Sequence, residues 1–314
     1  MNILQALVDE LGLDADLITV FANTAPYRYK VYQIPKRNSA GMRTIAHPSK
    51  ELKIVQRLLV DILSGELRVH DNAYAYITGK SIRDNALRHK NSRYLLKMDF
   101  TNFFPSITPD LFLEKLASSG IDTNAVDRNL LTKILFRRPV RHGALELSIG
   151  APSSPLISNF VMYDFDVALS EACEDNNITY TRYADDLTFS TSRKGLLSEL
   201  ANIVIANLAQ TTGNSIQVNA QKTVHSSKAH NRHVTGITLT NDDSLSIGRS
   251  RKRLISSMIH KFSHNQLPPI QVPRLQGLIS FASYIEPDFY QRMERKYGKE
   301  VLQEIKKPVD TREI

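Results

Sequence analysis

The alternation of hydrophobic and polar positions divides the chain into short helices and strands without a regular repeat. From Ser49 to Leu63, apolar residues recur every three or four positions, which predicts an amphipathic helix. Residues 93–100 (RYLLKMDF) form a compact apolar run that ends near an acid, as a buried strand would. Residues 178–190 place β-branched and aromatic residues on both sides of a short polar centre, which is typical of a β-hairpin.

Capping and turn residues place further elements. Ser81 and Asp84 have the spacing of a capping box ahead of a short helix that runs to His89. Thr108-Pro109 is expected to open another helix, which Gly120 closes. The remaining predicted elements are two N-terminal helices, a hairpin from YRYKVYQI and MRTIAHP, helices at 122–136, 154–174 and 194–212, strands near 216, 223 and 233–239, and C-terminal helices. This mixture predicts an α+β protein with an antiparallel sheet and a helical C-terminal part.

Composition narrows the class of partner. The chain has 314 residues, of which 42% are hydrophobic, and a net charge of +8, which favours a polyanionic partner such as nucleic acid. A single cysteine, Cys173, excludes an internal disulfide and fits a reducing compartment. The N-terminus lacks the basic segment of a signal peptide, and no apolar run is long enough to span a bilayer. We therefore expect a cytoplasmic protein that does not enter a membrane.

The segment YTRYADDLTFS (180–190) places Asp185 and Asp186 side by side at the predicted hairpin tip. Aspartate favours turns by itself, so turn chemistry is one explanation, and a pair of carboxylates presented to a divalent cation is the other. A third acid, Asp99, ends the strand LLKMD, and it would join the pair if that strand lies beside the hairpin. Clustered acids repel one another unless cations neutralise them, and Mg²⁺ prefers carboxylate, phosphate and water oxygens. A basic chain with such a site indicates metal-assisted displacement at phosphorus.

These motifs resemble those of reverse transcriptases, and they occur in the same order. RYADDLTFS resembles the catalytic hairpin, KMDFTNFFPSI resembles motif A, and GAPSSPLISNFVMYDFD resembles motif B of the bacterial enzymes. MRTIAHPSKELKIVQ is similar to the fingers segment, and GNSIQVNAQKT to the motif around a palm lysine. NALRH (85–89) and RHVTG (232–236) resemble elements typical of retron reverse transcriptases. The resemblance covers most of the chain and indicates a bacterial retron reverse transcriptase.

The resemblance implies a right-hand polymerase fold. It implies N-terminal helices and fingers at 1–92, a palm at 93–235 with a fingers insertion around 108–148, and an RNA-binding thumb at 236–314. The implied activity is RNA-directed DNA synthesis from deoxynucleoside triphosphates with two Mg²⁺ ions, for which Mn²⁺ can substitute. The implied partners are a structured non-coding RNA that serves as primer and template, its DNA product, and an effector protein encoded nearby. The product would be branched, RNA-linked DNA (msDNA) that starts from a guanosine 2′-hydroxyl, and the complex would act against phage.

The resemblance also assigns roles to residues. The expected catalytic residues are Asp99, Asp185, Asp186 and Lys222, and the expected metal contacts are the same three aspartates with Phe100. Lys222 would protonate the leaving pyrophosphate, although it could equally be a solvated lysine. The expected nucleotide-binding residues are Lys36, Arg43, Phe104, Gly150, Ala151 and Pro152. Phe104 would exclude a 2′-hydroxyl, unless it is an ordinary core aromatic like Phe103.

Several assignments stay open at the level of sequence. Arg37 competes with Lys36 for the triphosphate, and Ile149 stands where the family usually has glutamine. The expected RNA-binding residues are Asn85, His89, Arg249, Arg251, Lys252 and Arg253. The first two could instead make a structural bond, and the basic cluster could be a solvated face. Two other functions remain: another bacterial reverse transcriptase of the diversity-generating or abortive-infection kind, and a catalytically silent RNA-binding scaffold.

Overall fold

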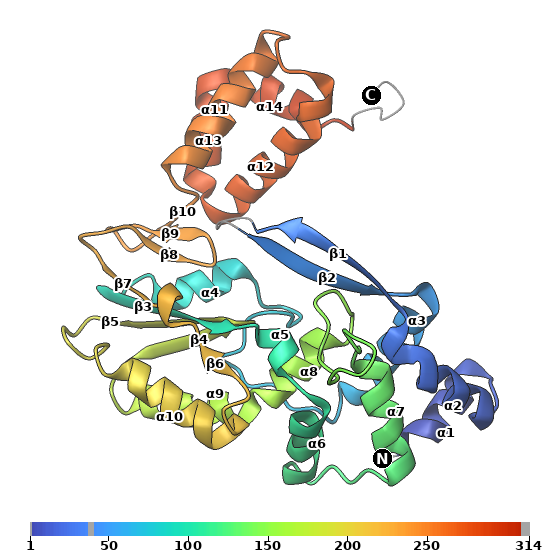
Figure 1. Ribbon diagram of the computed structural model, residues 1–314. Coiled ribbons are helices and arrows are strands. Elements are labelled where there is room, and N and C mark those ends of the chain that lie inside the picture. The colour runs from blue at the N-terminus through green and yellow to red at the C-terminus, as the bar shows by residue number, and fades with distance from the viewer. Residues whose placement is uncertain (1, 37–40, 309–314) are drawn as a thin grey trace. The chain divides into compact units, whose positions relative to one another are not determined.

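The computed structural model describes residues 2–36 and 41–308, and the chain divides into two compact units. The first unit comprises Met1–Lys80, Leu96–Ser190 and Lys194–Val224. The second comprises Ser81–Leu95, Thr191–Arg193 and His225–Ile314. Figure 1 shows the elements of both units in chain order. The predicted limits of fingers, palm and thumb remain a prediction. In the described part of the chain, no helix is long and apolar enough to cross a membrane.

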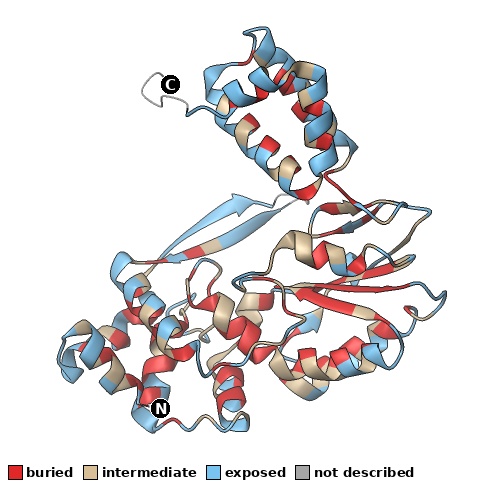
Figure 2. Ribbon diagram, turned by 180° about the vertical axis from the view of Figure 1, so that it is seen from behind, coloured by how far each residue is buried: buried red, intermediate tan, exposed pale blue. Residues whose placement is uncertain are grey.

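A helical layer in the first unit contains α1 (Ile3–Leu11), α2 (Ala15–Thr24), α3 (Lys50–Leu63) and α7 (Ala125–Leu135), which pack on one another. The apolar stripe predicted from Ser49 onward is the buried face of α3, and Ser49 caps this helix by accepting the Leu52 N–H. The layer holds the base of the β1 (Tyr29–Pro35) and β2 (Met42–Pro48) hairpin. Most of β1 is exposed, whereas the end of β2 is buried (Figure 2). The predicted first hairpin is therefore confirmed.

The central sheet of the first unit has the strand order β4-β5-β3-β6. The strands on this path are β3 (Tyr94–Thr101), β4 (Thr179–Tyr183), β5 (Asp186–Thr191) and β6 (Gln217–Val218). The fifth strand of the sheet, β7 (Val224–Ser227), pairs with β3 off the path. β4 and β5 are antiparallel partners, as are β3 and β6. Helix α9 (Tyr163–Glu174) packs on β4, and α10 (Leu200–Thr212) packs on α9 and β6. The sheet thus places the end of β3 beside the start of β5.

The remaining helices of this unit are α5 (Phe103–Ser106), α6 (Pro109–Ser118) and α8 (Ser154–Val161), with short 3₁₀ turns at Ala25–Tyr27 and Ala220–Lys222. Thr108 caps α6 and Pro109 is its first residue, as predicted. The single helix predicted at 154–174 is wrong, because the helix is interrupted at Met162. Every residue from Ile157 to Met162 is buried, so apolar periodicity could not reveal the break. Helix α10 begins at Leu200 rather than near 194, since Gly195 has a φ of +88°.

The second unit combines a small sheet with helices. It contains α4 (Ile82–His89), α11 (Arg249–Ser263), α12 (Val272–Ile285), α13 (Pro287–Tyr297) and α14 (Lys299–Ile305), with a 3₁₀ turn at Pro269–Gln271. Its strands are β7 (Val224–Ser227), β8 (Arg232–Val234), β9 (Ile237–Leu239) and β10 (Leu245–Ser246), of which the last three form a sheet in the order β10-β9-β8. Helix α4 packs on β8 and β9. One apolar core runs from this sheet through the C-terminal helices.

Two sequence motifs of this unit have structural explanations. The capping box is confirmed, because Ser81 and Asp84 each accept a hydrogen bond from the other's backbone N–H. In the RHVTG motif, Thr235 and Gly236 form the two-residue turn between β8 and β9, with φ values of +47° and +79°. Positive φ at both central residues is the geometry of a tight hairpin turn, and only glycine adopts it without strain. Arg232, which opens the motif, is buried and donates to the carbonyls of Ser92 and Thr240.

His89, at the end of α4, makes the stability of the protein sensitive to acid. Burial lowers its pKa from 6.5 to about 3, and the charge of Arg88 acts in the same direction. Below pH 6.5 the unfolded chain therefore binds a proton that the folded protein excludes. The contribution of neutral His89 to stability is complete above that pH and decreases as the pH falls toward 3.

We expect this histidine to destabilise the protein by about 2 kcal/mol at pH 5 relative to neutral pH. Urea unfolding of wild type and His89→Gln at pH 5 and pH 7.5 measures the effect. The variant should lose less stability between the two pH values, whatever its stability at pH 7.5. Equal losses in both proteins would show that His89 is not the acid-sensitive group.

Candidate active site

The two adjacent aspartates lie at the tip of the β4–β5 hairpin. Tyr183 and Asp186 are the last paired residues, so Ala184 and Asp185 form a tight turn between them. Ala184 has a φ of +56°, which is unusual for a residue other than glycine. The Phe100 N–H donates to the Asp185 carbonyl at 3.2 Å, which fixes the end of β3 against the tip. The end of β3, which carries Asp99, therefore lies beside the turn that carries Asp185.

The charges of the three aspartates act on one another. Burial raises the pKa of Asp185 to about 6, and the negative charges of Asp99 and Asp186 add to this effect. Burial also raises the pKa of Asp186, where Asp99 acts in the same direction and Lys97 and Lys222 oppose it. The structure thus gathers the three acids that the sequence placed on two separate elements. Such a group holds its negative charge at an energetic cost that a cation would relieve.

Lys222 is the nearest cationic partner of this group. Its Nζ lies 2.8 Å from Asp99 Oδ1, and the Asn219 N–H donates to the Asp99 carbonyl at 2.7 Å. Within residues 2–36 and 41–308, no three His, Cys, Asp or Glu side chains form a ready-made metal cage. The donor set nevertheless fits a hard divalent cation, because it consists of carboxylate oxygens whose mutual repulsion is only partly compensated. The Phe100 side chain stacks on Phe103 in the core, so only its backbone is available to such an ion.

A fully buried ion pair supports the hairpin from behind. The Arg182 Nη2 lies 2.5 Å from Asp166 Oδ2, and both side chains are 0% exposed. Arg182 Nη1 also donates to Asn159 Oδ1 and to the Ala184 carbonyl, each at 3.1 Å. The Tyr180 hydroxyl donates to Asp166 Oδ1 at 2.7 Å. One guanidinium therefore connects α8, α9 and the turn that carries Asp185.

The same arginine also contacts a distant segment through its backbone. Its N–H donates to the Asn72 carbonyl at 2.7 Å, and its carbonyl accepts the Tyr74 N–H at 2.8 Å. Asn159 adds a bond from its side-chain amide to the Ala75 carbonyl at 3.0 Å. The sequence analysis did not identify this network, because it assigned Arg182 only to the RYADDLTFS motif.

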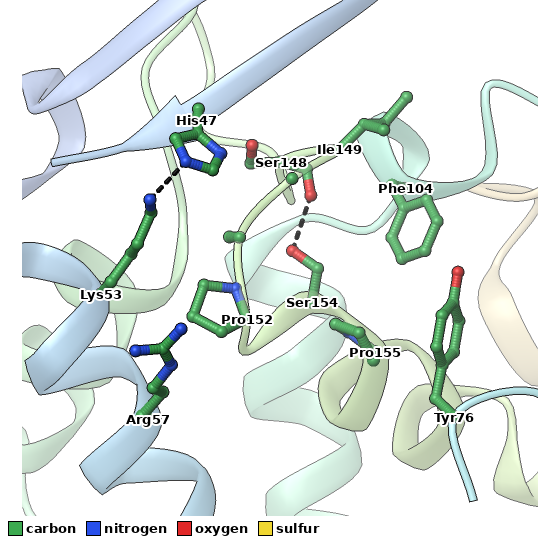
Figure 3. Close-up of a pocket in the computed structure, with 12 residues that line it drawn as sticks. His47, Lys53, Arg57, Tyr76, Phe104, Ser148, Ile149, Pro152, Ser154 and Pro155 are labelled. Atoms are coloured by element: carbon green, nitrogen blue, oxygen red, sulfur yellow. Dashed lines mark hydrogen bonds between the residues drawn. The ribbon is translucent and has the colours of Figure 1, made fainter. Parts of the chain in front are cut away.

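A pocket beside the acids contains several of the predicted nucleotide-binding residues (Figure 3). Its walls come from β2, α3, α5, the loop that contains Tyr76, and the 148–155 segment. The lining residues are His47, Lys53, Arg57, Tyr76, Phe104, Ser148–Pro152, Ser154 and Pro155. Gly150 has a φ of +122°, and a Cβ there would lie 3.2 Å from the Ala46 carbonyl oxygen. Only glycine fits this close approach to β2. Ala151 is buried, and Pro152 is partly buried.

The two neighbouring phenylalanines of α5 have different surroundings. Phe103 is buried against Phe100, whereas Phe104 is partly exposed and faces the pocket. Tyr76, which sequence analysis did not single out, lines the same pocket and has a φ of +64°. Partial burial and the charge of Asp185 raise the pKa of Tyr76, and Arg43 opposes this shift. Tyr76 therefore connects the pocket electrostatically with both Asp185 and Arg43.

The remaining predicted nucleotide contacts lie on the β1–β2 hairpin. Lys36 and Arg43 are exposed, and Arg43 pairs with Ile34 in the strand register. Arg37, the competitor of Lys36, lies outside the described residues. Ile149 is half-buried in the pocket wall, and its carbonyl accepts the Ala46 N–H at 3.0 Å. That backbone bond does not depend on whether the side chain is isoleucine or glutamine.

The predicted RNA-binding residues of the second unit fall into three groups. Asn85 and His89 are 0% exposed, which favours their structural role over a direct contact to RNA. Two cations make internal contacts: Arg251 donates to the Gly236 carbonyl at 3.0 Å, and Lys252 pairs with Glu286 at 2.6 Å. Arg249 and Arg253 are exposed, one turn apart on α11. These two arginines are the best-placed of the six for contact with a polyanion.

The fold and the acidic hairpin define a right-hand polymerase. A solved structure of apo telomerase from Candida tropicalis matches 85% of this chain with a TM-score of 0.50 at 13% identity, and the match spans 58% of that chain. The family described as reverse transcriptase (RNA-dependent DNA polymerase) matches residues 34–239. The chain belongs to this family, and it is an RNA-directed DNA polymerase.

Similarity to individual proteins places the chain more narrowly. It is 49% identical to the retron Ec83 reverse transcriptase of Escherichia coli, over 89% of this chain and 90% of that protein. It is also 34% identical to the retron Ec73 reverse transcriptase of Escherichia coli, over 88% of this chain and 89% of that protein. The protein therefore belongs to the bacterial retron reverse transcriptases, as its motifs indicated.

The ion pair of Arg182 and Asp166 should be essential for stability. Replacing Arg182 with Met leaves a buried carboxylate without its partner, which typically costs about 3–5 kcal/mol. The exposed Lys307–Glu304 pair is the matched control, since Lys307→Met should cost at most about 1 kcal/mol. Urea unfolding of the two variants measures the difference. Adding Asp166→Leu to Arg182→Met should recover part of the loss, and equal costs for both single variants would refute the importance of the buried pair.

Proposed function

We propose that this polymerase joins deoxynucleotides at the site formed by Asp99, Asp185 and Asp186, with divalent cations as cofactors. The observation that carries the proposal is the meeting of β3 with the hairpin tip, where the Phe100 N–H donates to the Asp185 carbonyl at 3.2 Å and the three acids gather. The three side chains and the Phe100 backbone would hold two Mg²⁺ ions, or Mn²⁺ in their place. Bound there, the ions would supply charge neutralisation and Lewis acidity for displacement at phosphorus.

Residues of the chain would perform the remaining steps. Lys222, held at Asp99 by its ion pair, would donate the Nζ proton to the leaving pyrophosphate. Arg43 would bind the triphosphate through its planar guanidinium, with Lys36 as a second cation. Gly150, Ala151 and Pro152 would allow the nascent base pair to lie against the backbone. Phe104 would pack against the sugar and exclude a 2′-hydroxyl.

The proposed substrate is a structured non-coding RNA that serves as primer and template. Its product would be branched, RNA-linked single-stranded DNA begun at a guanosine 2′-hydroxyl. The relatives named as retron reverse transcriptases support this choice over reverse transcriptases of the diversity-generating or abortive-infection kind. The presence of all three acids argues against a catalytically silent RNA-binding scaffold. Arg249 and Arg253 would contact RNA phosphates, and the complex would act in the cytoplasm against phage with an effector protein encoded nearby.

A pair of variants separates chemistry from RNA binding. Asp185→Asn should lower the rate of DNA synthesis at least about 10³-fold, because it removes a carboxylate that neutralises the cations. RNA affinity should remain close to that of wild type.

Arg249→Ala combined with Arg253→Ala should weaken RNA binding and flatten its salt dependence, with turnover on a pre-bound primer–template largely retained. Primer extension and RNA titration measure both properties, and full activity of Asp185→Asn would overturn the assigned site.

The role of Phe104 in sugar selection can be tested by substitution. Phe104→Ala should increase ribonucleotide use relative to deoxynucleotide use by roughly 10- to 200-fold, because it removes the group that meets the 2′-hydroxyl. Single-nucleotide kcat/KM values for both sugars measure the ratio. Phe103→Leu is the matched control, since Phe103 is buried against Phe100 and should affect stability rather than the ratio. If Phe104→Ala leaves the ratio of ribonucleotide to deoxynucleotide use unchanged, Phe104 has only a packing role.

A further inference from the structure

The pocket has a basic wall to which the proposed function assigns no role. Lys53 and Arg57 lie four residues apart on α3, so their side chains project from the same face of the helix. Lys53 Nζ contacts His47 Nε2 on β2, which orients the lysine along the pocket wall (Figure 3). Arg57 is exposed and also lines the pocket. Two cations are thus presented to one cavity from a rigid helix.

This wall is separate from the catalytic acids. Burial raises the pKa of Tyr76 and the charge of Asp185 adds to this effect, so Tyr76 marks the side of the pocket toward the acids. In Figure 3, Lys53 and Arg57 lie on one side of Pro152, whereas Tyr76 and Phe104 lie on the other. The catalytic side and the basic side of the pocket are therefore different.

The pocket also has an apolar surface. Tyr76 and Phe104 present aromatic rings, and Ile149, Pro152 and Pro155 add aliphatic surface. Gly150 keeps the backbone close to β2, where a Cβ would lie 3.2 Å from Ile45 Cγ2. A nucleotide unit combines a flat apolar base with a phosphate, so it suits a site with an apolar floor and a basic edge.

We propose that Lys53 and Arg57 bind a backbone phosphate of the single-stranded template as it enters the pocket. The proposal rests on the proposed function. The primer terminus and the triphosphate must both lie at the carboxylates, because bond formation occurs there. A phosphate held at the opposite side of the pocket therefore belongs to the template strand. The guanidinium supplies a bidentate contact and the ammonium a point charge.

The test compares two primer–templates that differ only in a 5′ single-stranded template overhang. Lys53→Gln combined with Arg57→Gln should weaken binding of the overhang substrate about tenfold. The slope of log affinity against log salt should become shallower by about 0.7 for each phosphate that the variant no longer neutralises. Affinity for the blunt duplex and the KM for deoxynucleotides should remain as in wild type.

Two control variants distinguish the site from general effects. Lys50→Gln removes one positive charge from the same helix outside the pocket, and it should leave binding unchanged. Lys53→Arg combined with Arg57→Lys keeps both charges and should restore most of the affinity. Unchanged affinity of the Gln variant for the blunt duplex shows that this variant does not fail by unfolding.

Each other outcome overturns the inference. A raised KM for deoxynucleotides with unchanged overhang affinity would assign the two cations to the triphosphate. Equal weakening of overhang and blunt substrates would assign them to general charge, and unchanged binding would make them a solvated face. The overhang affinity is measured without turnover, so a wild-type protein that binds the overhang but makes no DNA would refute the proposed function and not this site.

Discussion

The buried guanidinium of Arg182 is the interaction on which the geometry of the catalytic hairpin depends. A buried ion pair is stabilising only when further hydrogen bonds satisfy its remaining polar atoms, because both charges lose their hydration. Here Asp166 binds both Arg182 and Tyr180, and Arg182 also reaches Asn159 and the Ala184 carbonyl. Since Ala184 has a positive φ, the turn does not follow from local preference. It is held from the interior, which fixes where the neighbouring Asp185 presents its carboxylate.

The two sides of this turn have opposite electrostatics. Behind it, the negative charge of Asp166 is matched by a cation at 2.5 Å. In front of it, burial raises the pKa values of Asp185 and Asp186, the negative charges of neighbouring aspartates add to this effect, and Lys222 and Lys97 oppose it only in part. Support from the interior and negative charge at the turn fit the proposed cation site, because a carboxylate held in place needs less rearrangement to bind an ion.

Sequence reasoning succeeded where a signal is local and failed where it depends on distant partners. The capping box at Ser81, the helix start at Thr108-Pro109 and the hairpin around Asp185 each depend on a few adjacent residues, and the structure confirms them. The interruption at Met162 lies inside a stretch buried on all sides, so no periodicity marked it. A charged residue in a motif is normally expected to be exposed. Arg182 and Arg232 are nevertheless buried, because their guanidinium groups donate hydrogen bonds to carboxylate and carbonyl oxygens of other elements. Lys53 lies within the segment that resembles the fingers but nothing there marked it as a binding residue, and Arg57 and Tyr76 lie outside every quoted motif.

The substitution at position 149 shows how the pocket divides its tasks between backbone and side chains. Ile149 is attached to β2 by its carbonyl, and Gly150 follows the same strand at the distance that a Cβ would prevent. Backbone contacts therefore hold this pocket wall against β2, and they do not depend on the side chain at position 149. A glutamine there would offer hydrogen-bonding atoms to a bound strand, whereas isoleucine offers only surface. Because the floor of this pocket is consequently apolar, polar contacts to a nucleic acid strand must come from its edges, where the cationic side chains of α3 and the β1–β2 hairpin lie.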